Sequence, residues 1–255
     1  MRAIRLLASG LFCFSVLPSL AVPLAEENFE AQPTGTKIGD FGPGWNSITA
    51  LFTAGNQAGL AANGSGYLDA PSRTGAGDRQ RYAWLDVSSA FNARGAGNDL
   101  IVETVKMFIP EVTSSTYGGM VMFDQFGDVV ATIGVDMLTG RTLTDATTGV
   151  SNVQALLGQY NDIELLADYG TGVVDYFFNG SQIGSTQMSA SSRFTGLGDF
   201  DFYNNGFNAT TSVAFRYDDY AVQAIPEPAT VTLLGLGLAG LAALRRHKGA
   251  SKGAC

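Results

Sequence analysis

The sequence predicts an all-β fold, an antiparallel sandwich, for the central part of the 255-residue chain. Glycine and asparagine interrupt it throughout, and no amphipathic stretch of about 12 residues or more has a helical period. Short β-branched and aromatic runs recur between turns, as in a sandwich. No repeat of solenoid period is present, which disfavours a β-helix. The predicted strands are Asn28–Glu30, Trp45–Phe52, Gly66–Asp69, Tyr82–Val87, Leu100–Ile109, Gly119–Asp124, Val129–Asp136, Asp162–Tyr169, Gly172–Phe178, Ser181–Ile183, Phe200–Tyr203 and Val213–Val222.

The clearest turn is Asn179-Gly180, which follows Tyr176–Phe178 and precedes Ser181–Ile183. Both turn residues tolerate positive φ, as a type I′ hairpin turn demands. The segments just before it, 162–168 and 172–176, form a second predicted antiparallel pair. In the last strand, residues 213, 215 and 217 alternate with 214, 216 and 218, so the two sets face opposite sides.

The N-terminus has the pattern of a signal peptide. Arg2 and Arg5 precede an apolar run over residues 6–17, and small residues follow up to Ala21. A membrane anchor is the alternative, but the run is too short to cross about 30 Å of hydrocarbon at 1.5 Å per residue. We therefore expect signal peptidase to cleave after Ala21.

The C-terminus combines a short motif, an apolar run and a basic cluster. Pro226-Glu227-Pro228 precedes the uncharged residues 229–244, and Arg245 and Arg246 follow directly. The run could be a permanent anchor or a buried helix, but a buried helix is disfavoured because the run has no polar face and ends in a basic cluster. The cluster is expected to stay cytoplasmic.

This arrangement resembles the PEP-CTERM sorting signal of Gram-negative bacteria. The resemblance implies processing by exosortase, transient membrane anchoring through 229–244, and delivery to the cell surface or an exopolysaccharide matrix. The domain organisation that follows is a signal peptide (1–21), a β-sandwich domain (22–224) and a sorting segment (225–255).

The mature domain is strongly acidic. Residues 22–224 contain 22 of the 23 acidic residues but only nine of the 15 basic ones. Such a surface repels nucleic acid. The single histidine (His247) and both cysteines (Cys13 and Cys255) lie in the terminal segments. Ser-His-Asp and Cys-His catalysis, and metal sites built on histidine or cysteine, are therefore excluded from the mature domain.

Residues Tyr160–Gly184 resemble the central strands of concanavalin A-like jelly rolls of the laminin-G and bacterial lectin type. The opening Glu27–Glu30 and the closing Phe215–Val222 also fit this resemblance. It implies a jelly-roll sandwich over most of residues 26–223, in which the first and last strands lie side by side.

Carboxylate chemistry is the remaining route to catalysis, as in glycoside hydrolysis. Hydrolases with this fold carry Glu, Asp and Glu on same-side positions of one strand, and that signature is absent. Glu103 has apolar residues two positions away on both sides, and Asp199-Phe200-Asp201 contains no glutamate. We therefore predict a protein that is not an enzyme.

A Ca²⁺ site is conceivable where the first and last strands meet. Pairing of these strands would bring Glu27 or Glu30 near Asp218 and Asp219, and hard Ca²⁺ takes carboxylate oxygens. The alternative is a solvated acidic edge that discourages aggregation.

Glycan binding would use exposed aromatic rings and polar planar side chains. The predicted site is the turn-like segment after the eleventh strand, with Tyr203, Asn204, Asn205 and Phe207. Trp45 and Trp84 are other aromatic candidates, and we expect both to be core residues.

The sequence therefore predicts an exported, surface- or matrix-associated protein without enzymatic activity that binds extracellular glycan. Two alternatives stay open. One is a carboxylate-dependent glycoside hydrolase of the same fold, and the other is a purely structural matrix protein.

Overall fold

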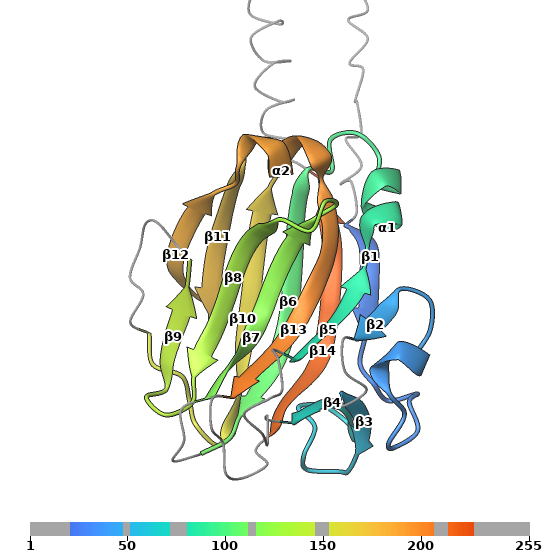
Figure 1. The fold of residues 1–255 in the computed structure, drawn as a ribbon, viewed down its shortest axis with the longest axis vertical. Coiled ribbons are helices and arrows are strands. Elements are labelled where there is room, and N and C mark those ends of the chain that lie inside the picture. Colours follow the sequence, from blue (N-terminus) through green and yellow to red (C-terminus); the bar gives the residue numbers. More distant parts are fainter. Residues whose placement is uncertain are drawn as a thin grey trace, which may run out of the picture. The chain divides into compact units, whose positions relative to one another are not determined.

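Two antiparallel sheets lie face to face in the computed structural model (Figure 1). The residues it describes are 21–47, 52–71, 81–111, 116–145, 153–206 and 214–226. The predicted all-β sandwich is confirmed in this part of the chain. The predicted signal helix and the apolar segment 229–244 lie outside the described residues. None of the helices in the described part has the length and apolarity that a membrane span requires.

The larger sheet holds eight of the described strands. Its spatial order is β12 (Ser181–Gln187), β11 (Val173–Phe178), β10 (Gln159–Asp168), β6 (Leu100–Ile109), β14 (Ala214–Ile225), β4 (Gly66–Pro71) and β3 (Thr53–Asn56). The eighth strand, β1 (Val22–Glu27), also pairs with β14, over Tyr220–Ala224, whereas β4 pairs with its first half. β14 thus pairs with β4 before the β-bulge around Asp219 and with β1 after it. The φ of Asp219 is +48°.

The smaller sheet holds six of the described strands and lies in front in Figure 1. Its spatial order is β2 (Trp45–Ser47), β5 (Arg81–Asp86), β13 (Leu197–Gly206), β7 (Thr116–Asp124), β8 (Val129–Asp136) and β9 (Arg141–Thr144). The described helices are short: η1 (Ile38–Asp40), α1 (Ser88–Ala93) and α2 (Ala190–Thr195).

Two of the described strands were predicted to the residue. β6 and β8 have the predicted bounds. The type I′ hairpin is confirmed, because Asn179 and Gly180 have φ values of +48° and +74° between the paired residues Phe178 and Ser181. The predicted pairing of the first and last strands is also confirmed, with Glu27 opposite Tyr220.

The predicted strand Asn28–Glu30 is wrong. The first strand ends at Glu27, and the chain turns at Phe29, whose φ is +59°. The Glu27 carboxylate accepts a hydrogen bond from the Phe29 backbone N–H at 2.7 Å, and this local bond replaces the strand ladder. Strands β3 and β9 are only four residues long and were not predicted from their sequence.

The core between the sheets is rich in aromatic rings. Phe202 of β13 lies against Tyr217 and Tyr220 of β14, with ring centroids 4.6 and 5.0 Å apart, and stacks on Trp45 of β2 at 6.2 Å. Because Phe202 faces this core, strand alternation turns its neighbours Asp201 and Tyr203 to the opposite face of the sheet.

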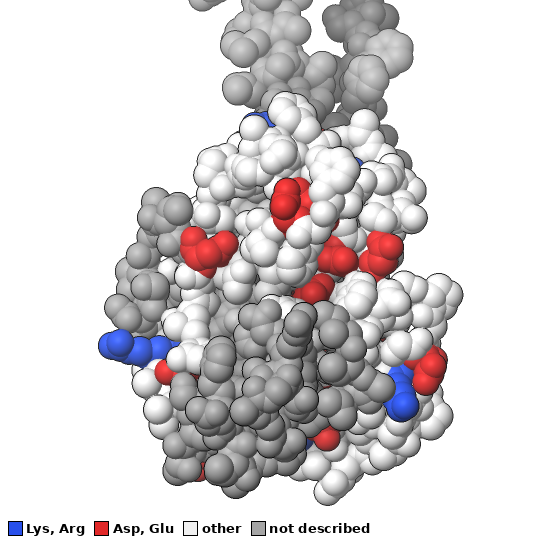
Figure 2. Space-filling view, in the orientation of Figure 1, with Lys and Arg blue, Asp and Glu red and all other residues white. Residues whose placement is uncertain are grey.

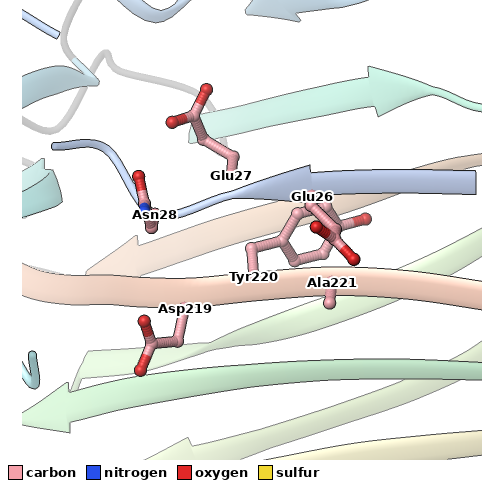
Figure 3. Close-up of a pocket in the computed structure, with 6 residues that line it drawn as sticks. All are labelled: Glu26, Glu27, Asn28, Asp219, Tyr220 and Ala221. Atoms are coloured by element: carbon pink, nitrogen blue, oxygen red, sulfur yellow. The ribbon is translucent and has the colours of Figure 1, made fainter. Parts of the chain in front are cut away.

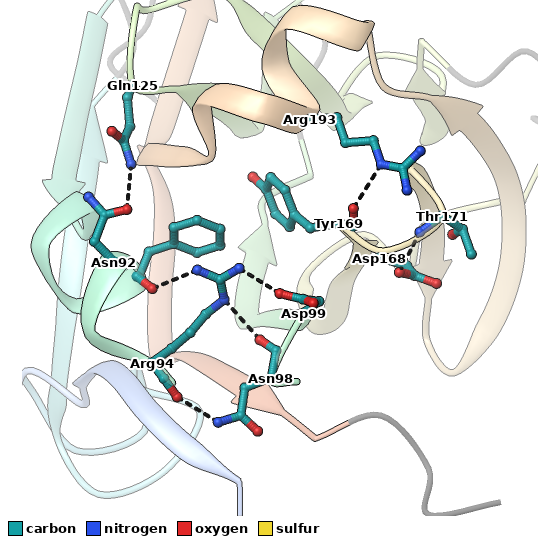
Figure 4. A network of polar contacts seen from close by, with 10 residues as sticks. Asn92, Arg94, Asn98, Asp99, Gln125, Asp168, Tyr169, Thr171 and Arg193 are labelled. Atoms are coloured by element: carbon teal, nitrogen blue, oxygen red, sulfur yellow. Dashed lines mark hydrogen bonds and ion pairs between the residues drawn. The ribbon is translucent and has the colours of Figure 1, made fainter. Parts of the chain in front are cut away.

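A polar network joins α1 to the ends of β6 and β10 (Figure 4). The Arg94 guanidinium donates to the Phe91 and Asn98 carbonyls and pairs with Asp99 at 2.6 Å. Arg193 of α2 donates to the carbonyl of Tyr169 just after β10. These contacts fasten the short helices to one end of the sandwich.

Gly119→Ala is expected to lower the free energy of unfolding by about 1–3 kcal/mol through overpacking. A Cβ at Gly119 would lie 2.1 Å from the Ile133 carbonyl oxygen and 2.4 Å from the Gly134 Cα on the neighbouring strand. Gly39→Ala is the matched control, because a Cβ there meets nothing within 4 Å. Urea unfolding measures both changes. Equal stability of the two variants would contradict the close strand approach.

Candidate functional site

The outer face of the six-stranded sheet carries the most distinctive group of polar and aromatic side chains. Tyr82, Trp84 and Asp86 alternate along β5, and Asp199 and Asp201 alternate along β13. The register places Asp86 opposite Asp199 and Trp84 opposite Asp201. We call these five residues the acidic face. In Figure 2, acidic side chains gather on the upper half of this side, with no blue atoms between them.

The carboxylates of the acidic face lie close together. Asp199 and Asp201 are two residues apart on one strand, which separates their Cα atoms by about 6.6 Å. Directly opposite Cβ atoms in an antiparallel pair, such as those of Asp86 and Asp199, are about 5 Å apart. Val121 and Phe123 of β7 pair with Asp201 and Asp199 on the other side.

Asp201 is buried without a partner. Its side chain is only 8% exposed, and its Oδ1 has no hydrogen-bond partner within the described structure. Burial, reinforced by the negative charge of Asp199, raises the pKa of Asp201 to about 8. Burial also raises the pKa of Asp199 to about 6, and the Asp86 and Asp124 carboxylates contribute repulsion. At neutral pH Asp201 is therefore mostly protonated and Asp199 mostly ionised.

The neighbouring carboxylates of Asp124 and Asp86 differ from those of Asp199 and Asp201 because hydrogen-bond donors satisfy them. Asp124 accepts the N–H groups of Phe126 and Asp128 at 2.9 Å each, and such donors lower its pKa despite burial. Asp86 accepts the N–H and hydroxyl of Ser88 at the start of α1. A hollow of about 240 Å³ opens beside them, lined by Asp86, Ser88, Asp124, Gln125, Gly127, Gly198 and Asp199.

The two tryptophans have different environments. Trp45 is a core residue, as predicted, and is 7% exposed. The prediction that Trp84 also belongs to the core is wrong. Trp84 is half-buried on the outer face, because its neighbours Ala83 and Leu85 take the inward positions of β5. Tyr82 is half-buried beside it, with its ring centroid 6.2 Å from that of Tyr203.

The residues predicted to bind glycan lie mostly on a strand. Tyr203, Asn204 and Asn205 belong to β13, so the predicted turn is wrong up to Gly206. Tyr203 is 7% exposed, and Asn204 is buried and donates to the Ala70 carbonyl of the other sheet at 2.6 Å. Asn204 is therefore used in a contact between the two sheets, whereas Tyr203 lies beside Tyr82 on the outer face. Phe207 and the side chain of Asn205 lie outside the described residues.

The four carboxylates predicted to bind Ca²⁺ do not converge. Glu27 and Asp219 line one hollow of about 400 Å³, but Figure 3 shows their carboxylates directed to opposite sides. Among the described residues, no group of three or more acidic side chains is close enough to hold a metal ion.

Backbone amides occupy three of these four carboxylates instead, and Glu27 is one of them because it accepts the Phe29 N–H. Glu30 accepts the N–H groups of Ser65 and Gly66 at 2.7 and 2.6 Å, which lowers its pKa. Asp218 accepts those of Ala62 and Asn63 at 2.8 and 3.1 Å. The Glu30 and Asp218 carboxylates therefore tie the β3–β4 loop to the terminal strands.

The sequence contained a signal for the acidic face that our prediction did not use. Asp199-Phe200-Asp201 was set aside because it lacks glutamate, although two aspartates at i and i+2 must share a face of a strand. Their proximity to Asp86 and Trp84 depends on pairing between strands more than 100 residues apart.

Comparison with known proteins bears on both parts of the chain. The PEP-CTERM protein-sorting motif matches residues 224–246, overlapping the last two residues of β14. No curated protein matches the sequence.

Solved structures with the same fold include the cellulose-induced protein Cip1, with a TM-score of 0.50 and 13% identity over 78% of this chain and 96% of that one. The CBM2 module of an evolved Dit protein from Lactobacillus casei BL23 phage J-1 has a TM-score of 0.52 and 10% identity, over 82% and 97% of the two chains. A GH43 glycoside hydrolase has a TM-score of 0.51 and 17% identity, over 82% of this chain and 42% of its own.

The chain thus carries a PEP-CTERM sorting motif, which indicates export and surface sorting, behind a β-sandwich whose structural neighbours are jelly-roll carbohydrate-binding and glycoside hydrolase domains.

Proposed function

We propose that this chain is a surface- or matrix-associated protein that binds an extracellular glycan on the acidic face and does not act on it chemically. The observation that carries the proposal is the half-buried Trp84 opposite Asp201, a buried residue whose Oδ1 has no hydrogen-bond partner in the described structure. An aromatic ring can stack on a sugar ring while nearby carboxylates bind hydroxyl groups, which is the usual composition of a ligand site. The carbohydrate-binding neighbours of the same fold support it.

The route to the surface follows from the two ends of the chain. Signal peptidase would remove residues 1–21 during export from a Gram-negative cytoplasm, and exosortase would process the sorting segment. Anchoring through 229–244 would be transient. The protein would then reside at the cell surface or in the exopolysaccharide matrix.

Removal of residues 227–255 is expected to release the protein from the cell surface into the medium, because most of the sorting motif is lost. The cut after Pro226 keeps Ile225, which pairs with Leu100 in the sheet. Removal of 249–255 is the matched control, since those residues lie outside the matched motif. Surface labelling of intact cells measures the effect. If the 227–255 truncation stays on the surface, the sorting role of Pro226-Glu227-Pro228 with Arg245 and Arg246 is wrong.

Binding itself can be tested with the purified full-length chain in mild detergent on a panel of immobilised polysaccharides. We expect saturable binding to at least one glycan. A panel on which nothing binds above background would contradict glycan binding and favour the purely structural alternative.

One observation favours hydrolysis as a second candidate function. Asp199 and Asp201 share a face, and the separation of about 6.6 Å between their Cα atoms is compatible with carboxyl groups at the distance that inverting glycosidases leave for a water molecule. Their pKa values of about 6 and about 8 would make Asp199 the base and Asp201 the acid at neutral pH. Incubation of each bound glycan with the protein distinguishes the two functions. Release of reducing ends that is lost in Asp201→Asn would establish hydrolysis and contradict simple binding.

A further inference from the structure

We propose that the acidic face selects glycans that carry free amino groups, with protonated amines bound between Asp86, Asp199 and Asp201. This inference rests on the proposed glycan binding and specifies the class of ligand. It would place a polymer of unacetylated amino sugars across β5 and β13, with one sugar ring on Trp84.

The surface around Trp84 is negatively charged. Three carboxylates lie within two residues of one another along or across β5 and β13. No side chain is basic within residues 82–86 of β5, 117–124 of β7 and 197–204 of β13. A glycan that carries carboxylates would be repelled there, whereas a cationic glycan would be attracted.

One oxygen of Asp201, Oδ1, has no hydrogen-bond donor in the described structure. A buried acceptor without a donor is destabilising, and in native structures such groups are usually paired. An ammonium group brings three N–H donors together with a positive charge, and charge-assisted hydrogen bonds are about twice as strong as neutral ones. A hydroxyl group of a neutral sugar would supply a donor but no charge.

A metal ion suits this face less well than an amine. The acidic side chains in the described part of the chain do not form a group that could hold a metal ion. An ammonium group does not need several ligands around one point, because its hydrogen bonds can reach carboxylates that lie side by side. The spread of Asp86, Asp199 and Asp201 over two strands suits several amines along a polymer.

Ligand binding should displace a proton from the site. The titratable groups that interact with Asp201 or lie beside it are Asp199 on its own strand, Tyr82 and diagonally Asp86 on β5, and Glu103 of β6 and Tyr220 of β14 in the core. All of these are acidic or neutral, so burial and repulsion keep Asp201 protonated at neutral pH. The positive charge of a bound amine favours the ionised carboxylate and so lowers the pKa of Asp201. Affinity should therefore rise as the pH increases from 6 to 8, for as long as the amine itself stays protonated.

The test compares two oligosaccharides of equal length that differ only in the amine, a chitosan oligomer and its fully N-acetylated counterpart. With the full-length protein in mild detergent at pH 6.5, we expect at least tenfold tighter binding of the chitosan oligomer by calorimetry. The preference should fall to within about twofold in Asp199→Asn/Asp201→Asn. Asparagine closely matches the size of aspartic acid, and melting temperatures verify that the variant is folded. If the double variant does not fold, Asp86→Asn at an exposed position should by itself reduce the preference for the chitosan oligomer.

Asp175→Asn is the matched control, because it removes one carboxylate from the other sheet, where Asp175 accepts a hydrogen bond from Gln182. It should keep the full preference. Equal or tighter binding of the acetylated oligomer would overturn the inference while leaving glycan binding intact. The inference would also be overturned if Asp175→Asn weakened the preference as much as Asp86→Asn did. The preference would then reflect only the net negative charge of the protein. Failure of both oligomers and of every polysaccharide in the panel would instead overturn the proposed function.

Discussion

Trp84→Ala is expected to weaken glycan binding by about 30-fold or more. Truncation of a central tryptophan in a binding site typically costs about 2 kcal/mol or more, and each 1.4 kcal/mol corresponds to a factor of ten. Trp84 is the largest half-buried side chain of the acidic face, and it lies opposite Asp201. Its loss would remove the apolar surface on which a sugar ring can stack. Calorimetric titration with the tightest glycan of the panel measures the change.

The matched control for Trp84→Ala is Phe177→Ala. Phe177 is also a half-buried aromatic residue in a strand, but it belongs to β11 of the other sheet. We expect its removal to change the affinity by less than twofold. The reverse ranking, with Phe177→Ala more damaging than Trp84→Ala, would move the glycan site to the eight-stranded sheet and contradict the acidic face.

Glu103→Gln is expected to stabilise the protein at neutral pH and to do so much less at pH 4. Glu103 of β6 is 1% exposed, and neither carboxyl oxygen has a hydrogen-bond partner in the described structure. Burial raises the pKa of Glu103 well above its ordinary value, and Asp201 adds repulsion. The Tyr220 hydroxyl, close by but outside hydrogen-bond geometry, opposes the rise.

The sign of the pH dependence follows from this raised pKa. The folded state holds the Glu103 proton more tightly than the unfolded state, whose pKa lies near 4.5. Below that value both states are protonated and the group has no effect. As the pH rises from 4.5 towards the folded pKa, the unfolded state releases its proton first, and stability falls by up to about 1.4 kcal/mol per pH unit. Glutamine is neutral throughout and avoids this loss.

Thermal unfolding at pH 4 and pH 7.5 measures the effect of Glu103→Gln. The gain in melting temperature should be clearly larger at pH 7.5. Glu164→Gln is the control, because Glu164 is only partly buried on the adjacent strand β10 and its pKa is raised by burial alone. A gain for Glu103→Gln that is the same at both pH values would show that the carboxyl does not titrate as proposed.

Local patterns were sufficient for several parts of the structure. Alternating side chains identified β6, because a strand with one buried face has a period of two residues. The Asn179-Gly180 hairpin depends only on the tolerance of two adjacent residues for positive φ. The sorting motif at 224–246 depends on linear order and spacing. Each of these features is encoded within a few neighbouring residues.

The candidate site required the tertiary structure, since it depends on which face of each strand is covered. Phe202 and Asn204 turn inward against β14 and β4, and this packing directs Asp201 outward. Trp84 became a surface residue because Leu85 took the inward position. The carboxylates of Glu27 and Asp218 accept hydrogen bonds from backbone N–H groups in place of binding a cation. The sequence by itself therefore determined most of the strands and the sorting motif of this protein, whereas the pairing of distant strands decided which carboxylates and aromatic rings share a surface.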